Sequence, residues 1–471
     1  MSSDELAYLS ASELVERYRD KTLSPVEVTE AVLAQVERHN GPVNAFVLVD
    51  ADRALTDAKA SEKRWAKGEP AGLVDGVPAT IKDLVLAKGW PMRGGSRITS
   101  PDPVSEDAPI TARLREHGAV LIGKTTTPEF GWKGVTDSPL TGVTRNPWDT
   151  SRTPGGSSGG AAVAAALGMG ALHVGSDGGG SIRIPSAFTG IFGHKPSFGR
   201  VARYPNSAFG TLSHAGPMTR TVTDAALMLT VISEPDTRDW FTLPYDESDY
   251  REGLEDGVAG LRIAFSPALG YATVEPEIAA RVAEAAKLFE TLGAKVEQTD
   301  PGFADPSDIF CPHWYAGAAY AARNYTSEQM AMLDPGLRQI IAQGRALELL
   351  DYMAAVDKRS GLGVHMKKFH ETYDLLLTPT MPLAAFDAGR ELPASSDAER
   401  WMSWTPFSFP FNLTQQPAAT VPCGFTTGGL PAGLQIVGRM HDDKTVLRAA
   451  RAFERERPFV MPRAPRVTHE G

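Results

Sequence analysis

Cysteine is scarce in this sequence, which has two thiols, Cys311 and Cys423, among 471 residues. Two cysteines that far apart exclude a disulfide framework and a four-cysteine zinc site, because each needs several cysteines at defined spacings. His370-Glu371 also lacks the second histidine of a zincin helix, since position 374 is an aspartate. We therefore expect no metal and a reducing, cytoplasmic setting.

Long hydrophobic runs are lacking too. The longest stretch of small apolar residues, 161–172, contains two glycines and is shorter than the about 20 residues that cross a bilayer. The first 20 residues carry acids where a secretory signal needs basic residues, and no apolar segment follows them. These features predict a soluble, unprocessed protein that does not associate with membranes.

Basic residues are not in excess. The chain has 47 Lys and Arg against 57 Asp and Glu, a net charge of −10. Nucleic-acid affinity depends largely on clustered Lys and Arg, so this balance argues against a nucleic-acid partner. With 42% hydrophobic and 22% charged residues, the composition is that of a globular protein with a large core.

Helix and strand patterns alternate along the first third of the chain. Ser24, Pro25 and Glu27 form a capping box that predicts the start of a helix ending near 40–42. The alternation indicates an α/β layer fold with a largely parallel β-sheet. Further elements predicted up to residue 122 are helices at 51–67 and 110–117 and strands at 77–82 and 119–122.

Glycine is concentrated between residues 155 and 180. Ten of these 26 residues are glycine, where the chain average of 45 in 471 would give about 2.5. The glycines form two clusters, each with serine, at the ends of a predicted helix at 161–167 and a predicted strand at 171–176. Such clusters can turn backbone N–H groups toward an anion or oxyanion, and they are also common in plain tight turns.

A serine nucleophile needs a base, and Lys82 is one candidate. It ends an otherwise apolar predicted strand, where desolvation would disfavour the ammonium and supply a neutral amine near pH 7. Lysine at a strand end is also commonly a solvated surface charge. The residues alone leave both interpretations open.

Several segments together closely resemble the amidase signature family. Three of these segments correspond to the family's catalytic motifs and occur in the family's order and spacing. The resemblance covers most of the chain and is weakest across residues 234–371. The three segments are Gly76-Val77-Pro78-Ala79-Thr80-Ile81-Lys82-Asp83, Pro154-Gly155-Gly156-Ser157-Ser158-Gly159-Gly160 and Asp177-Gly178-Gly179-Gly180-Ser181-Ile182-Arg183. The others are Gly193-His194-Lys195-Pro196, Gly216-Pro217-Met218-Thr219-Arg220, 375–382 and the stretch from Gln416-Pro417-Ala418 through Gly433-Leu434-Gln435.

The resemblance implies a hydrolase that cleaves amide C–N bonds through an acyl-enzyme, without a cofactor. Ser181 would be the nucleophile, Ser157 the relay after a cis Gly156–Ser157 bond, and Lys82 the base. The implied oxyanion hole consists of the backbone N–H groups of Gly178, Gly179, Gly180 and Ser181. Ser158, Asp177 and Arg183 would support these groups, and aryl esters and carbamates (urethanes) become possible additional substrates.

The same resemblance implies the amidase signature fold, a large mixed, mostly parallel β-sheet sandwiched by helices, and it suggests how the chain is organised. No linker marks a firm boundary, so we expect one domain over 1–471. Its expected parts are N-terminal helices at 1–70, a core with the motifs at 71–230, a variable substrate-side region at 231–400 and the C-terminal part of the core at 401–471. A homodimer is the family-level expectation for the assembly.

Aromatic residues are frequent in the segments that build the family's substrate pocket. We predict pocket positions for Phe130, Trp132, Phe209 and Trp314, although buried aromatics commonly serve the core. A cleft lined by several of them would favour an apolar or aryl substrate. Tyr204, Tyr315, Trp404, Phe407, Phe409 and Phe411 share these segments.

Three other interpretations fit parts of the sequence. Segment 155–159 matches the G-x-S-x-G nucleophile elbow of an α/β-hydrolase-type serine esterase, with His365 or His370 as a downstream histidine. Segment 118–125 matches a P-loop, but its middle reads as a buried strand. Family members also act as the glutaminase subunit of tRNA-dependent amidotransferases, although 212–217 lacks the Asp-Gln pair usual before their Gly-Pro.

Overall fold

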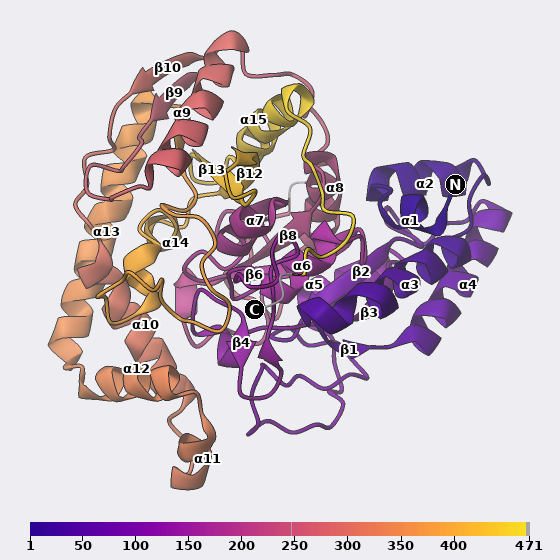
Figure 1. The fold of residues 1–471 in the computed structure, drawn as a ribbon, viewed down its shortest axis with the longest axis horizontal. Coiled ribbons are helices and arrows are strands. Elements are labelled where there is room, and N and C mark those ends of the chain that lie inside the picture. Colours follow the sequence, from indigo (N-terminus) through magenta and orange to yellow (C-terminus); the bar gives the residue numbers. More distant parts are fainter. Residues whose placement is uncertain (246, 468–471) are drawn as a thin grey trace.

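The computed structural model describes residues 1–245 and 247–467. Within these ranges, eleven strands form one sheet that helices flank, consistent with the predicted α/β class (Figure 1). In spatial order the strands are β1 (Phe46–Val49), β3 (Val120–Thr125), β2 (Pro78–Lys82), β6 (Leu172–Asp177), β8 (His214–Thr219), β7 (Phe192–Lys195), β12 (Ala418–Phe425), β13 (Pro431–Gly438), β11 (Leu375–Pro379), β9 (Arg262–Phe265) and β10 (Lys295–Gln298). A separate pair comprises β4 (Asp137–Ser138) and β5 (Gly142–Val143).

The mixed sheet is confirmed, but the prediction that it is mostly parallel is wrong. Four of the ten neighbouring strand pairs in the described sheet are parallel, and the other six are antiparallel. β12 and β13 are joined by a short turn, which permits only antiparallel pairing. β8 lies between β6 and β7 and runs antiparallel to both. The alternation of helix and strand in the sequence could not reveal this insertion.

The helices carry the expected signals at their ends. The capping box of Ser24 and Glu27 begins α3, and the segment predicted at 51–67 is α4. α3 runs past the predicted end at 40–42 and stops before Asn44, whose left-handed backbone ends the helix and whose amide donates to Asn40 O. The Asn40 side chain accepts the amides of Ala45 and Phe46, which follow the helix. The helices are α1 (Ser3–Ala7), α2 (Ala11–Arg19), α3 (Pro25–Val43), α4 (Ala51–Lys67), α5 (Pro109–Glu116), α6 (Gly159–Ala166), α7 (Arg183–Thr189), α8 (Val222–Ile232), α9 (Pro276–Thr291), α10 (Ser307–Ala321), α11 (Ser327–Met332), α12 (Pro335–Ala346), α13 (Leu349–Thr372), α14 (Pro410–Leu413) and α15 (Asp443–Glu456), with short 3₁₀ turns η1 (Glu129–Gly131), η2 (Gly210–Leu212) and η3 (Trp401–Trp404).

Two adjacent parallel strands bring the motif residues together. β2 pairs with β6 in parallel register, with Ile81 opposite Val174. Parallel neighbours end at the same edge of a sheet, which is where α/β proteins place ligand sites. Lys82 at the end of β2 and Asp177 at the end of β6 therefore lie near each other.

Helices α10–α13 form a layer at one side of the molecule, at the left in Figure 1, far from the N-terminal helices. Trp314 of α10 and Leu337 and Ile341 of α12 belong to a second hydrophobic core that also contains Trp132 and Trp401. This core supplies an apolar wall next to the edge of the sheet that carries the motifs.

Candidate active site

The Lys82 amine lies among three serine hydroxyls. Its Nζ is 2.7 Å from Ser157 Oγ, 2.8 Å from Ser158 Oγ and 3.0 Å from Ser176 Oγ. Lys82 is fully buried, so the interpretation as a solvated surface charge is wrong. Sequence reasoning missed Ser176. Its place at the end of the predicted strand 171–176, directly before the second glycine cluster, could have marked it as a residue of the site.

The environment of Lys82 favours its neutral form. Burial lowers the pKa of the Lys82 ammonium well below its ordinary value, and the positive charge of Arg203 lowers it further. The carboxylate of Asp177 acts in the opposite direction, and the first two effects prevail. An amine in this state can accept a proton.

The first glycine cluster places Ser157 over the amine. The Gly156–Ser157 peptide bond is cis, as the resemblance implied. Thr136 Oγ1 holds this turn by donating to the Gly155 carbonyl and accepting from the Gly159 amide, at 2.8 and 3.1 Å. A Cβ on Gly160 would lie 2.4 Å from the Thr126 amide nitrogen, so glycine is required where α6 begins.

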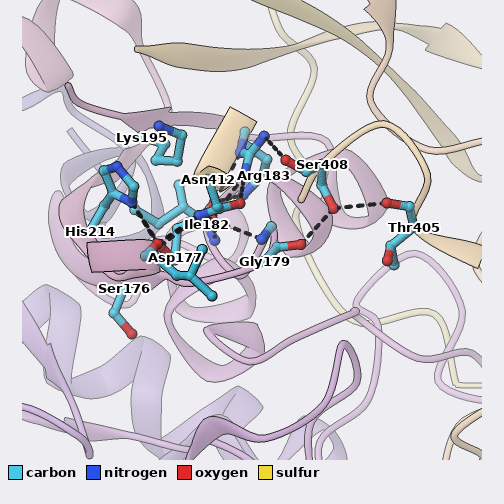
Figure 2. Close-up of polar contacts among 12 residues, drawn as sticks. Ser176, Asp177, Gly179, Ile182, Arg183, Lys195, His214, Thr405, Ser408 and Asn412 are labelled. Carbon is cyan, nitrogen blue, oxygen red and sulfur yellow. Dashed lines mark hydrogen bonds and ion pairs between the residues drawn. The ribbon is translucent and has the colours of Figure 1, made fainter. Parts of the chain in front are cut away.

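The second cluster forms a tight loop between β6 and α7 (Figure 2). Asp177 organises it, since its carboxylate accepts the Gly180 amide at 2.7 Å and the Ile182 amide at 3.1 Å. The Gly180 N–H is therefore already engaged, which corrects its assignment to the oxyanion hole. This leaves the N–H groups of Gly178, Gly179 and Ser181 as candidate donors.

Arg183 ties the loop to the C-terminal part of the sheet. Its guanidinium forms an ion pair with Asp177 and donates to Ser408 O and Asn412 Oδ1 at 2.8 and 2.7 Å (Figure 2). It also donates to Gln435 Oε1 at 2.8 Å. The Ser408 hydroxyl donates to Gly179 O at 2.6 Å. Sequence reasoning missed the roles of Ser408 and Asn412, because both lie more than 200 residues from the loop and no local pattern marks them.

The charge state of Asp177 is fixed by these partners. Burial would raise the pKa of the carboxyl, but the charge and hydrogen bonds of Arg183 outweigh it and hold that pKa far below its ordinary value. Asp177 is thus a permanent anion that accepts hydrogen bonds from the loop.

A cavity of about 220 Å³ opens above the two motif serines. Ser157 and Ser181 line it, as do all four aromatics predicted for the pocket: Phe130, Trp132, Phe209 and Trp314. Phe209 and Trp314 stack with their ring centroids 3.9 Å apart. Among the described residues, no hydrogen bond joins the Ser157 and Ser181 hydroxyls, although both face this space.

The other aromatics from those segments lie elsewhere. Phe409 stacks on Phe310 in the second core, and Phe407 and Phe411 are buried together in a third. A larger cavity of about 680 Å³ beside α13 is lined by His370 and Arg439 and contains none of the motif serines. The smaller cavity, which Ser157 and Ser181 line, is therefore the candidate active site.

The competing motifs do not assemble. His365 and His370 hydrogen bond to the backbone carbonyls of Pro301 and Tyr373, so neither serves Ser157 as an elbow would need. Lys124 of the P-loop match is the second-last residue of the buried strand β3 and pairs with Asp83 at 3.1 Å. In the described ranges, no three His, Cys, Asp or Glu side chains are grouped to hold a metal.

Known proteins resemble this chain along most of its length. The Amidase family model matches residues 27–447. The acylamidase of Rhodococcus erythropolis is 37% identical over 467 residues, covering 98% of each chain. A glutamyl-tRNA(Gln) amidotransferase subunit of Myxococcus xanthus is also 37% identical, covering 98% of this chain and 100% of its own. None of the helices in the described ranges has both the length and the apolarity to cross a bilayer.

Solved structures show the same fold. A bacterial aryl acylamidase of the amidase signature family superposes with a TM-score of 0.89 at 33% identity, covering 96% of both chains. The 6-aminohexanoate cyclic dimer hydrolase superposes with a TM-score of 0.88 at 27% identity, covering 98% of this chain and 99% of that one. The chain thus belongs to the amidase signature family and is an amide-hydrolysing enzyme.

Proposed function

We propose that this enzyme hydrolyses amides of apolar or aryl compounds, with Ser181 as nucleophile, Ser157 as relay and Lys82 as base. The observation that carries the proposal is the 2.7 Å contact between Lys82 Nζ and Ser157 Oγ, beneath a cavity that Ser181 also lines. A nucleophile, a relay and a buried base within one small space suit acyl transfer.

The hydrogen bonds around Lys82 support its role as base. The Ser158 hydroxyl donates to Ser176 O at 3.1 Å, so its oxygen can only accept from Lys82. A neutral amine has two N–H groups and one lone pair. If the N–H groups are donated to Ser158 and Ser176, the lone pair is left to accept the proton of Ser157.

In the proposed reaction, Ser181 Oγ attacks the carbonyl carbon while its proton passes to Ser157 and the Ser157 proton passes to Lys82. The N–H groups of Gly178, Gly179 and Ser181 stabilise the oxyanion. The C–N bond then breaks, and Lys82 returns a proton through Ser157 to the leaving nitrogen. Water attacks the resulting ester by the same proton path, which releases the acid and restores Ser181.

The substrate class follows from the wall of the cavity. Phe130, Trp132 and Trp314 favour a flat apolar group, in keeping with an acylamidase and an aryl acylamidase among the similar proteins. Aryl esters and carbamates fit the same chemistry, because the oxyanion hole contacts only the carbonyl, and esterase and urethanase activities are part of the proposal. Matched p-nitrophenyl ester, p-nitroanilide and aryl carbamate probes test this range. Activity confined to glutamine would overturn it and favour the amidotransferase glutaminase.

Covalent labelling tests the nucleophile. The protein is treated with a fluorophosphonate or an aryl carbamate and examined by intact-protein mass spectrometry, with Ser181→Ala and Ser207→Ala as variants. Ser207 lines the same cavity and is the matched control. We expect one adduct in the wild type and in Ser207→Ala and none in Ser181→Ala. An adduct that persists in Ser181→Ala would refute the assignment.

We also propose a cytoplasmic location and a homodimeric assembly. The two free thiols, Cys311 and Cys423, support a reducing compartment. The dimer rests on the family resemblance, and light scattering coupled to size-exclusion chromatography tests it. The net charge of −10 supports a small-molecule partner over nucleic acid.

A further inference from the structure

The wall of the catalytic cavity is chemically two-sided. One side consists of apolar residues of α10 and α12, among them Ala318, Ala321, Leu337 and Ile341. The other side is the loop from Arg203 to Ser213. Among the described residues that line the cavity, Arg203 is the single charged one.

The Arg203 side chain is partly buried and has few protein partners. Its Nη1 donates to the Ser213 hydroxyl, and no carboxylate of the described chain lies within ion-pair distance of the guanidinium. The carboxylate of Asp239, whose charge raises the pKa of Arg203, accepts the backbone amide of Arg203 at 2.8 Å. A guanidinium has five N–H donors, so most of its hydrogen-bonding capacity is unused.

The guanidinium nevertheless keeps its charge. Desolvation lowers the pKa of Arg203 to about 10, while the Asp239 carboxylate acts in the opposite direction. That pKa remains far above neutrality, so the group is cationic during catalysis. A partly desolvated cation without a counterion binds an anion strongly, because charge-assisted hydrogen bonds gain most where water is excluded.

We infer that Arg203 is a specificity-determining residue that binds a carboxylate on the substrate. The substrate would then be an amide with an apolar or aryl group against α10 and α12 and a carboxylate a few bonds from the scissile carbonyl. This inference rests on the proposed function and narrows its substrate class. Planar carboxylates match the fork of a guanidinium, which favours them over other acceptors.

Isosteric substrate pairs test the inference. On the acyl side, succinyl p-nitroanilide is compared with isocaproyl p-nitroanilide, whose isopropyl group replaces the carboxylate. On the leaving-group side, p-acetamidobenzoate is compared with p-isopropylacetanilide. The readout is the ratio of kcat/KM for the acid to that for its hydrocarbon isostere. An apolar cavity without a cation would give a ratio below one, because the carboxylate must shed its water.

For the wild type we expect a ratio above one in one of the two series. Arg203→Met should lower that ratio about 10- to 100-fold, which corresponds to the loss of a charged hydrogen bond. Arg203→Lys should preserve part of it, because it retains the charge but not the fork.

Ratios at or below one in both series for the wild type would overturn the inference. This outcome needs no variant, so the test does not depend on whether the Arg203 variants fold. An unchanged ratio in a folded Arg203→Met would overturn it too. Hydrolysis of the neutral anilides with no preference for the acids would refute the role of Arg203 alone. Failure to hydrolyse any anilide, together with no adduct at Ser181, would refute the proposed function itself.

Discussion

Arg183 and Asp177 form an ion pair in which both side chains are fully buried. Arg183 Nε and Nη2 contact the two carboxylate oxygens at 3.0 and 2.9 Å, a bidentate arrangement. The pair lies within the loop that carries Ser181, and it joins that loop to Asn412 (Figure 2). Arg183 also donates to Gln435. The geometry of the nucleophile therefore depends on an interaction that does not contact the cavity.

Removing one partner of this pair should destabilise the enzyme strongly. Arg183→Met leaves a buried, unpaired carboxylate, and we expect a loss of about 3–5 kcal/mol in the free energy of unfolding. Urea denaturation measures it. Arg38→Met is the matched control, since its partner Asp4 is exposed and the pair should contribute little. Adding Asp177→Asn to Arg183→Met should recover part of the lost stability, because it removes the unpaired charge. Equal urea midpoints for Arg183→Met and Arg38→Met would contradict the prediction.

Activity should rise with pH through the depressed pKa of Lys82. Below that pKa the amine is protonated and cannot accept the Ser157 proton, so kcat/KM falls toward acid. Burial is the largest cause of the depression and the charge of Arg203 the next. Arg203→Gln should therefore raise the pKa of Lys82 and move the acid limb to higher pH. A pH profile on a neutral p-nitroanilide measures the shift, and an acid limb that stays in place or moves to lower pH would contradict it.

The two adjacent serines should differ in importance. Ser157→Ala removes the proton path, and we expect kcat/KM to fall by roughly 10²–10⁴. Ser158→Ala leaves the Lys82 contacts to Ser157 and Ser176 in place, so its loss should be much smaller. Steady-state rates on one p-nitroanilide compare them. Equal losses would show that Ser157 only positions the amine, as Ser158 does.

Gly180 should not tolerate a side chain. Its φ is +127°, and a Cβ would lie 2.5 Å from Ser408 Oγ and 2.6 Å from Ser408 Cβ. Gly180→Ala should shift the loop amides and lower kcat about 10²-fold or more, measured by steady-state kinetics. Gly361→Ala, in open space on α13, is the control and should stabilise the fold by roughly 0.5–1 kcal/mol at unchanged activity. Equal activity in both variants would refute the need for glycine.

Local signals in the sequence predicted much of this molecule. The capping residues Ser24 and Glu27 and the segment 51–67 specify helices through contacts within one turn, so the sequence alone locates them. Lys82, Ser157 and Ser181 were identified by their motifs. The parallel pairing of β2 and β6 brings their two motifs together. The alternating pattern predicted parallel strands but not which strands would be neighbours.

Interactions between distant segments were not predictable in the same way. The insertion of β8 between β6 and β7 made the sheet more antiparallel than expected, because strand order is decided by packing rather than by local pattern. The Asp177 carboxylate accepts a hydrogen bond from the Gly180 amide, and this contact forms only when the loop has turned. Arg203 is an ordinary arginine in the sequence, and only the fold turns it toward the cavity.

The hydrogen bonds that hold Arg183 determine when this enzyme can become active during its synthesis. Lys82, Ser157 and Ser181 all leave the ribosome within the first two-fifths of the chain, whereas Ser408, Asn412 and Gln435 come from its last seventh. A nascent chain or a fragment that stops before residue 408 contains every reacting group but lacks the partners that fix the nucleophile loop. Amide cleavage should therefore begin only when translation is nearly complete and these C-terminal residues have packed against the nucleophile loop.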